Sequence, residues 1–373
     1  MKPKSEAELA EIIAAASGPI SVQGGATRGL AVDGDAVSAG GLSGVSLYEP
    51  GALTLVAGAG TPVSEIETLL AAEGQRLAFE PMDHRGLLGT TGEPSIGGVV
   101  AGNYSGPRRI QAGACRDFLL GVRFVDGMGN VVKNGGRVMK NVTGYDLVKL
   151  MAGSFGTLGV LTEVSFKVLA QPEATAVVLI EGLSDAEAVE AMSKALGSPF
   201  DVSGAAHTPK GLDGEPVTMI RVEGFEDSVS YRAGRLQELL SSFGDCEVET
   251  SPDRTAAGWK WVRDVEAFHD ERGDVWRISC KPSAAPDLAT RLEADGLLYD
   301  WGGGLVWALV PEGTDIRARL GAFDGHATLV RAAEETRSRL GIFHPEAAGV
   351  AFLSQGLRKR FDPRGILNSG LMG

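Results

Sequence analysis

The residues best suited to hold a ligand lie in glycine-rich segments of the first half of the chain, and the densest runs from Ser95 to Pro107, SIGGVVAGNYSGP. It combines glycines, small apolar residues and one amide, Asn103, and it contains no charged residue. Glycine lets a large group approach the main chain closely, and an amide both accepts and donates hydrogen bonds. This composition disfavours a metal site and favours a planar, mostly uncharged group such as a flavin. The alternative is an ordinary glycine-rich turn.

Three further segments share this small-residue character. In Val22–Gly29, VQGGATRG, successive N–H groups can form an anion nest, and Arg28 can supply the positive charge that a pyrophosphate requires. The other two are Gly136–Asp146, GRVMKNVTGYD, and Gly153–Glu163, GSFGTLGVLTE, and each taken alone is a structural turn. Because an adenine dinucleotide lies extended, one long ligand explains four such loops in one half of the chain better than four coincidences.

Bulk properties limit the class of protein. The chain has 373 residues, enough for two domains, and a hydrophobic content of 43% allows a sizeable core. Its formal net charge of −13 argues against nucleic acid and anionic membrane surfaces as partners. Cys115, Cys246 and Cys280 are too few and too scattered for a zinc or iron–sulfur site, and they indicate reduced thiols and a cytoplasmic location. We expect no metal, no signal peptide and no membrane span.

The elements that must position these segments alternate between helix and strand. Helices are expected over 5–16 and 62–73, and strands over 20–22, 52–57, 117–125 and 160–169. After Gln171-Pro172 the order strand, helix, two strands, helix, strand (176 to 249) predicts a ferredoxin-like layer, which further strands near 275–280 and 305–310 extend. A helix over 346–360 precedes FDPRGILNSG, a tail whose Ile366 and Leu367 favour docking on another part of the protein.

The four segments, in this order, resemble the PCMH-type FAD-binding domain of the vanillyl-alcohol-oxidase superfamily. FEPMDH, SGPRR, GACRDFLLGVRFVDGMG and GRVMKNVTGYDLVKLMAGSFGTLGVLTEVSFKVL are similar to FAD-binding E subunits of bacterial glycolate oxidases, densely over Met1–Leu169 and again at DWGGGLVW and FDPRGILNSG. The resemblance implies an α+β fold. A two-subdomain FAD-binding domain would occupy 1–170, a smaller ferredoxin-like α/β cap domain for substrate or partner 171–335, and a C-terminal helix and tail returning to the FAD domain 336–373.

Position by position, the resemblance also implies the cofactor-binding residues. The pyrophosphate would lie at Gly24, Gly25, Ala26, Thr27 and Arg28; the flavin and ribityl groups near Pro81, Gly97, Gly98, Ala101 and Asn103; the adenine side under Gly156, Gly159 and Val160; and Asn368 would approach the isoalloxazine from the C-terminal side.

Two departures from relatives are informative. Many relatives tether the flavin through a histidine in the pyrophosphate loop, where this chain has Ala26 and Thr27, so we expect non-covalent FAD. Relatives that oxidise 2-hydroxy acids alone carry an HxGDGNxH-like motif in the second domain, and here the histidines are scattered: His207, His269, His326 and His344. The absence of the HxGDGNxH-like motif argues against catalysis by this chain alone.

Oxidation of a 2-hydroxy acid requires a base for the hydroxyl proton and a cation for the carboxylate. Arg108 and Arg109 follow the flavin segment and are candidates for the carboxylate, with a surface salt bridge or a contact with a partner subunit as the alternative. His84, Lys140 and Tyr145 are candidates for the base, although an ordinary loop residue is the simpler interpretation of each.

The resulting hypothesis is an FAD-binding subunit of a hetero-oligomeric complex that oxidises glycolate to glyoxylate. Its partners would be a larger catalytic flavoprotein subunit and an iron–sulfur subunit, and association with the inner face of the membrane would occur through them. The alternative is a self-sufficient FAD-dependent dehydrogenase of a small 2-hydroxy acid such as D-lactate. A Rossmann-type NAD enzyme is suggested only by Gly58-Ala59-Gly60, and Val63 stands where its third glycine is required.

Overall fold

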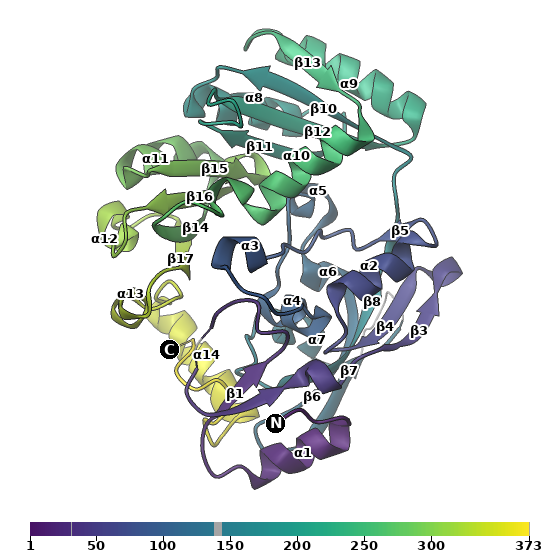
Figure 1. Ribbon diagram of the computed structural model, residues 1–373, viewed down its shortest axis with the longest axis vertical. Coiled ribbons are helices and arrows are strands. Elements are labelled where there is room, and N and C mark those ends of the chain that lie inside the picture. The colour runs from purple at the N-terminus through teal and green to yellow at the C-terminus, as the bar shows by residue number, and fades with distance from the viewer. Residues whose placement is uncertain (31, 138–143, 373) are drawn as a thin grey trace. The chain divides into compact units, whose positions relative to one another are not determined.

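The computed structural model describes residues 1–30, 32–137 and 144–372, and the chain divides into two units (Figure 1). The first contains Met1–Ser105, Gly113–Gln171 and Pro345–Gly373. The second contains Gly106–Ala112 and Pro172–His344. The segment Gly106–Ala112 therefore belongs to a different unit from the residues on either side of it. No pattern in the sequence indicated this assignment.

A five-stranded antiparallel sheet forms the centre of the first unit, in the order β3-β4-β8-β6-β7. Its strands are apolar on the covered side, and Leu55, Phe124, Val164 and Phe166 are completely buried. Because β4 pairs antiparallel with both neighbours, the turn that follows it does not belong to a parallel Rossmann unit. The strands are β3 (Val45–Glu49), β4 (Thr54–Gly58), β6 (Leu119–Val125), β7 (Val131–Gly135) and β8 (Val160–Lys167).

Smaller elements surround this sheet. A parallel pair of strands, β1 (Ile20–Gln23) and β2 (Asp35–Ser38), follows helix α1, and β5 (Gln75–Arg76) pairs with β9 (Leu169–Ala170). The helices are α1 (Glu6–Ala15), α2 (Val63–Ala71), α3 (Arg85–Leu88), α4 (Ile96–Gly102), α6 (Cys115–Phe118), α7 (Leu147–Met151) and α14 (Ala348–Phe361).

The C-terminal tail returns to β1. Ile20 N donates to Ile366 O at 2.7 Å, Asn368 N donates to Ile20 O at 3.0 Å, and Leu367 pairs with Ile20 in a parallel bridge. Ile366 and Leu367 are buried beside Leu9 and Ile13 of α1. The tail thus joins the first unit as an added strand.

The second unit contains an eight-stranded antiparallel sheet in the order β13-β10-β12-β11-β15-β16-β14-β17. It consists of two ferredoxin-like βαββαβ halves joined through β11 and β15, where the sequence predicted one half and an extension. The strands are β10 (Ala174–Glu181), β11 (Val202–Thr208), β12 (Val217–Gly224), β13 (Cys246–Glu249), β14 (Asp274–Cys280), β15 (Gly296–Asp300), β16 (Leu305–Val310) and β17 (Gly325–Arg331).

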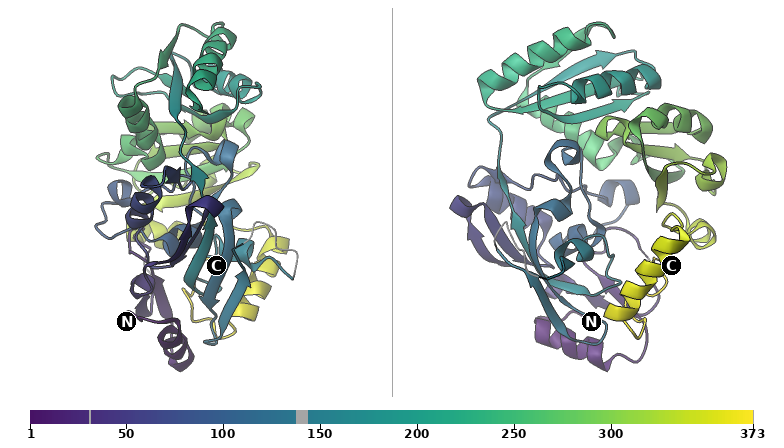
Figure 2. Two further views of the ribbon diagram at one scale, coloured as in Figure 1. Left: turned by 90° about the vertical axis from the view of Figure 1, so that its right-hand side faces the viewer. Right: turned by 180° about the vertical axis from the view of Figure 1, so that it is seen from behind.

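The two faces of this sheet differ. One face packs against α8 (Asp185–Leu196), α9 (Glu226–Leu240), α11 (Ala285–Leu292) and α12 (Ile316–Leu320) in one large apolar core. The other face packs on α10 (Pro252–Asp264) through Trp259 and Val262, so helices lie on both faces (Figure 2). The unit also contains α5 (Arg109–Ala112) and α13 (Glu334–Leu340).

Within the described ranges, no helix is both long and apolar enough to cross a membrane. The same residues contain no cluster of histidine, cysteine and carboxylate side chains that could hold a metal ion.

Candidate functional site

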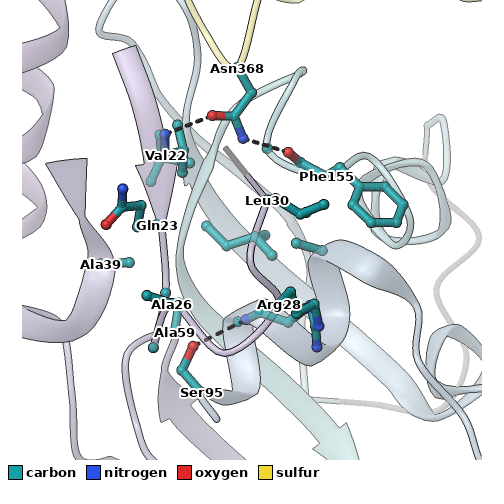
Figure 3. A pocket seen from close by; sticks show the side chains of 18 of the residues that line it. Val22, Gln23, Ala26, Arg28, Leu30, Ala39, Ala59, Ser95, Phe155 and Asn368 are labelled. Atoms are coloured by element: carbon teal, nitrogen blue, oxygen red, sulfur yellow. Dashed lines mark hydrogen bonds between the residues drawn. The ribbon is translucent and has the colours of Figure 1, made fainter. Parts of the chain in front are cut away.

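A single cavity in the first unit gathers most of the predicted cofactor-binding residues (Figure 3). It encloses about 1100 Å³ of space, part of which is open to solvent. Its lining comes from β1 and the loop after it, from α4, from the turn before β8 and from the tail. The predicted residues that line it are Gly24, Gly25, Ala26, Thr27, Arg28, Gly97, Gly98, Ala101, Gly156, Gly159, Val160 and Asn368.

Arg28 is the cation of this cavity. Its guanidinium lies 3.7 Å over the ring of Tyr104, and Nη1 donates to Gly98 O at 2.5 Å. Nε is buried and has no hydrogen-bond partner among the described residues. Burial lowers the pKa of Arg28, but arginine keeps its charge at any physiological pH. A buried guanidinium nitrogen without a hydrogen-bond partner favours an anion at this point, because an unpaired buried charge is costly.

The loop after β1 adds main-chain donors beside this cation. From Gly24 to Arg28 no backbone N–H donates to another atom of the described residues. Gly25 lies so close to the main chain at Glu93 that an added Cβ would stand 1.5 Å from Glu93 O. Successive main-chain N–H groups beside one guanidinium form the kind of nest that binds phosphate oxygens.

Within the Ser95–Pro107 run, residues Ile96–Gly102 form helix α4, where the sequence left a glycine-rich turn as the alternative to a ligand cradle. Ser95 Oγ caps it by accepting from Gly98 N at 3.3 Å, and Gly97 N donates to Ala59 O at 2.8 Å. Tertiary packing therefore overrides the low helix propensity of glycine. Asn103 ends the helix in the left-handed region at φ 48°.

Asn103 and Pro81 do not line the cavity. The Asn103 carboxamide oxygen accepts from Arg116 N at 3.0 Å, so this side chain fastens α4 to α6. Its expected contact with the flavin has no support in this geometry.

Asn368 closes the cavity from the tail. Its Oδ1 accepts from Val22 N at 2.7 Å, and its Nδ2 donates to Phe155 O at 2.7 Å (Figure 3). One amide thus connects three segments that are far apart in the sequence and that all face the same space.

Comparison with known proteins identifies the family. Residues 1–135 match the model of an FAD binding domain. Over 359 residues the chain is 37% identical to "Glycolate oxidase subunit GlcE" of Escherichia coli (strain K12), covering 95% of this chain and 92% of that protein. This chain belongs to the GlcE family. As members of this family are FAD-binding, the chain is a flavoprotein oxidoreductase with FAD as its cofactor.

Two further comparisons place the family more broadly. "Glycolate oxidase subunit GlcD" of Bacillus subtilis (strain 168) is 36% identical over 111 residues, which are 30% of this chain and 23% of that protein. The solved structure of alkyldihydroxyacetonephosphate synthase superposes with a TM-score of 0.69 at 17% identity, covering 99% of this chain and 76% of that one. The second likeness shows the fold, and it confirms the predicted PCMH-type architecture.

The residues present fit FAD. The unpartnered Arg28 Nε and the loop N–H groups suit the pyrophosphate, and the glycines of α4 leave room beside the main chain. No histidine or cysteine stands among the described residues that line the cavity, so they offer no side chain of the type that tethers a flavin.

Of the predicted catalytic residues, Arg108 has a structural partner. It forms a bidentate ion pair with Glu223 of β12, with Nη2 2.7 Å from Oε1 and Nε 2.8 Å from Oε2. Glu223 is buried, so the pair fastens α5 to the sheet of the second unit and is not a surface salt bridge.

Arg109 instead belongs to a cationic cluster that sequence reasoning missed. Its guanidinium carbon lies 4.6 Å from the ring centroid of Trp301, and that of Arg277 lies 5.0 Å from the same ring. His326 of β17 pairs with Ser279, two positions along β14 from Arg277, so both side chains project from one face of the sheet. The DWGGGLVW stretch, which contains Trp301, was the feature of the sequence that could have indicated this cluster.

The remaining candidates lie elsewhere. His84 is buried in the first unit, with its ring centroid 4.6 Å from that of Tyr104. Tyr145 is 89% exposed, which gives it no defined environment for proton transfer. Lys140 lies outside the described residues.

Proposed function

We propose that the chain is the FAD-binding subunit of a complex that oxidises a 2-hydroxy acid, with glycolate as substrate. The observation that carries the proposal is the Arg28 cavity in a chain similar over 95% of its length to a glycolate oxidase subunit. The missing HxGDGNxH-like motif supports a need for a larger flavoprotein subunit, and an iron–sulfur subunit would take the electrons onward.

The second unit offers residues for the substrate itself. Arg277 and Arg109, stacked on Trp301, present two guanidinium groups that suit a carboxylate. Burial, followed by the charges of Arg277, His344 and Arg109, lowers the pKa of His326 below its ordinary 6.5. A neutral imidazole on the same sheet face can accept the hydroxyl proton near neutral pH.

In this proposal the chain's residues bind and orient while the cofactor supplies redox chemistry. Arg28 and the loop N–H groups would hold the pyrophosphate of FAD without a covalent bond. Within the complex, Arg277 and Arg109 would hold the carboxylate, and His326 would take the hydroxyl proton. Bound FAD supplies the oxidising power, because a flavin accepts a hydride equivalent from an alcohol carbon.

The test begins with the absorbance spectrum of the purified chain before and after acid precipitation. Flavin in the supernatant supports non-covalent FAD, and a colourless protein contradicts the proposal. Glycolate is then added under anaerobic conditions to the chain alone and to the chain co-purified with its partner subunits. Bleaching that requires the partners supports the proposal. Bleaching of the lone chain by glycolate or D-lactate supports the self-sufficient dehydrogenase instead.

A further inference from the structure

Tyr104 lies against the cation of the cavity but is not part of the cavity lining. The guanidinium carbon of Arg28 is 3.7 Å from the centroid of the Tyr104 ring, and Arg28 lines the cavity while Tyr104 does not. At so short a distance the flat face of the guanidinium must lie on the ring, because a nitrogen pointing at the ring would penetrate it. The N–H groups lie in the guanidinium plane, so this contact occupies none of them.

The residues on either side of Tyr104 fix its main chain. The side-chain oxygen of Asn103 accepts from Arg116 N at 3.0 Å, and Ser105 Oγ accepts from Cys115 N at 2.9 Å. Both donors belong to helix α6. The tyrosine therefore lies between two hydrogen bonds to one element, which hold its backbone in place.

The ring of Tyr104 is confined as well. Gly102 lies so close to it that an added Cβ would stand 1.7 Å from Tyr104 Cε2, so only glycine leaves room for the ring. The buried ring of His84 makes a T-shaped contact with it at a centroid distance of 4.6 Å, and Phe155 makes another at 6.2 Å. Packed on these sides, the ring has little freedom to turn.

A ring holds an arginine differently from a carboxylate. In the second unit Glu223 holds Arg108 through a bidentate ion pair, which offsets the positive charge and occupies two nitrogens. An aromatic ring attracts a cation through its quadrupole and does not neutralise it. Arg28 Nε also has no hydrogen-bond partner among the described residues. The Arg28 guanidinium is therefore held in place and is still able to bind an anion.

We propose that Tyr104 is a positioning residue for the pyrophosphate of FAD, because its ring holds the Arg28 guanidinium in the orientation that meets the phosphate oxygens. Without the ring, Arg28 can adopt other rotamers and has to be ordered when FAD binds. Ordering a long side chain at a binding site reduces affinity, and a preorganised side chain avoids that cost. Since Arg28 and Tyr104 both belong to the first unit, this role is independent of the proposed reaction, which uses residues of the second.

The test is fluorescence titration of the full-length apoprotein with FAD. Tyr104→Leu should raise the Kd for FAD by roughly 2–10-fold, the cost of ordering one long side chain on binding. Tyr104→Phe keeps the ring and should retain the wild-type Kd. If Tyr104→Leu does not fold, Tyr104→Met removes the ring with a smaller loss of volume. The matched control is Phe243→Leu, which removes a ring 5.3 Å from Lys194 Nζ in the second unit and should leave the Kd unchanged.

A double-mutant cycle separates positioning from a general loss of structure. Tyr104→Leu is measured alone and together with Arg28→Met, the variant that lacks the cation. If the ring acts through Arg28, Tyr104→Leu should not change the Kd further once Arg28→Met is present. An undiminished loss in the Arg28→Met background would overturn the proposal, because the ring would then act on the cavity without Arg28. A wild-type Kd in Tyr104→Leu, or an equal loss in Tyr104→Phe or in Phe243→Leu, would overturn it as well.

Discussion

At the scale of single residues, the strongest indication of a ligand is the unpartnered Nε of Arg28. Arg28→Met removes the charge but keeps most of the side-chain volume over Tyr104. Charge-assisted hydrogen bonds are worth about 1.5–3 kcal/mol, so the Kd for FAD should rise by roughly 10–100-fold. Fluorescence titration of the apoprotein with FAD measures this change. Arg235→Met, at an exposed arginine of α9, serves as the control and should leave the Kd unchanged.

His326 leads to a prediction about pH. Burial, together with the neighbouring Arg277, His344 and Arg109, favours the neutral imidazole and lowers its pKa below 6.5. A proton acceptor must be neutral, so kcat/KM of the complex for glycolate should stay constant near pH 7 and fall only as the pH drops through that lowered pKa.

His326→Gln should reduce kcat by about 10²–10⁴-fold, the usual contribution of general base catalysis, and should remove this acidic limb. The matched control is His269→Gln, whose imidazole bonds to Asp264 O outside the cluster. An unchanged pH profile in His326→Gln would refute the role of His326.

At the scale of elements, the loop between β1 and β2 depends on a close approach of two main-chain segments at Gly25. A methyl group there would stand 1.5 Å from Glu93 O, so Gly25→Ala must displace the loop that carries the N–H groups. Overpacking of this kind costs about 1–3 kcal/mol, so both the Tm and the FAD affinity should fall. Thermal melts with and without FAD measure the two effects. Gly18→Ala, whose Cβ would meet nothing within 4 Å, should change neither.

Elements with a clear periodicity or a strong turn were predictable from the sequence, and those formed by tertiary contacts were not. The helix at 6–15 and the strands at 119–125 and 160–167 carry apolar patterns of the correct period. Helix α4 carries no such pattern, because Gly97 is required by its close contact with Ala59 and not by helix propensity.

The same distinction applies to the candidate site. Gly24 to Arg28 could be read from the sequence, since an anion nest is local to one loop. Arg277 and His326 could not, because only the register of β14 and β17 brings them onto one face of the sheet. Likewise, the second ferredoxin-like half was recognised only as an extension, because α12 spans five residues and gives too short a pattern.

At the scale of the whole molecule, the cavity is completed by a residue of the tail, separated by 346 positions from the strand it holds. Asn368 joins Val22, Phe155 and the tail, so the cavity should form only once the C-terminal segment has returned to β1. Asn368→Ala leaves Val22 N and Phe155 O without their partners, which costs about 1–3 kcal/mol for each buried group. We expect a lower Tm and a weaker Kd for FAD together, because the same bonds hold the fold and the cavity.

The conservative comparison for this variant is Asn368→Gly. Asn368 has a positive φ of 43°, which glycine adopts without strain and alanine does not. Both variants lose the two hydrogen bonds, so the loss they share measures the bonds, and the additional loss in Asn368→Ala measures backbone strain. If both variants bind FAD and unfold like the wild type, the tail contributes nothing to the cavity. If Asn368→Gly alone behaves like the wild type, backbone conformation at this position is what the cavity requires, and the amide is dispensable.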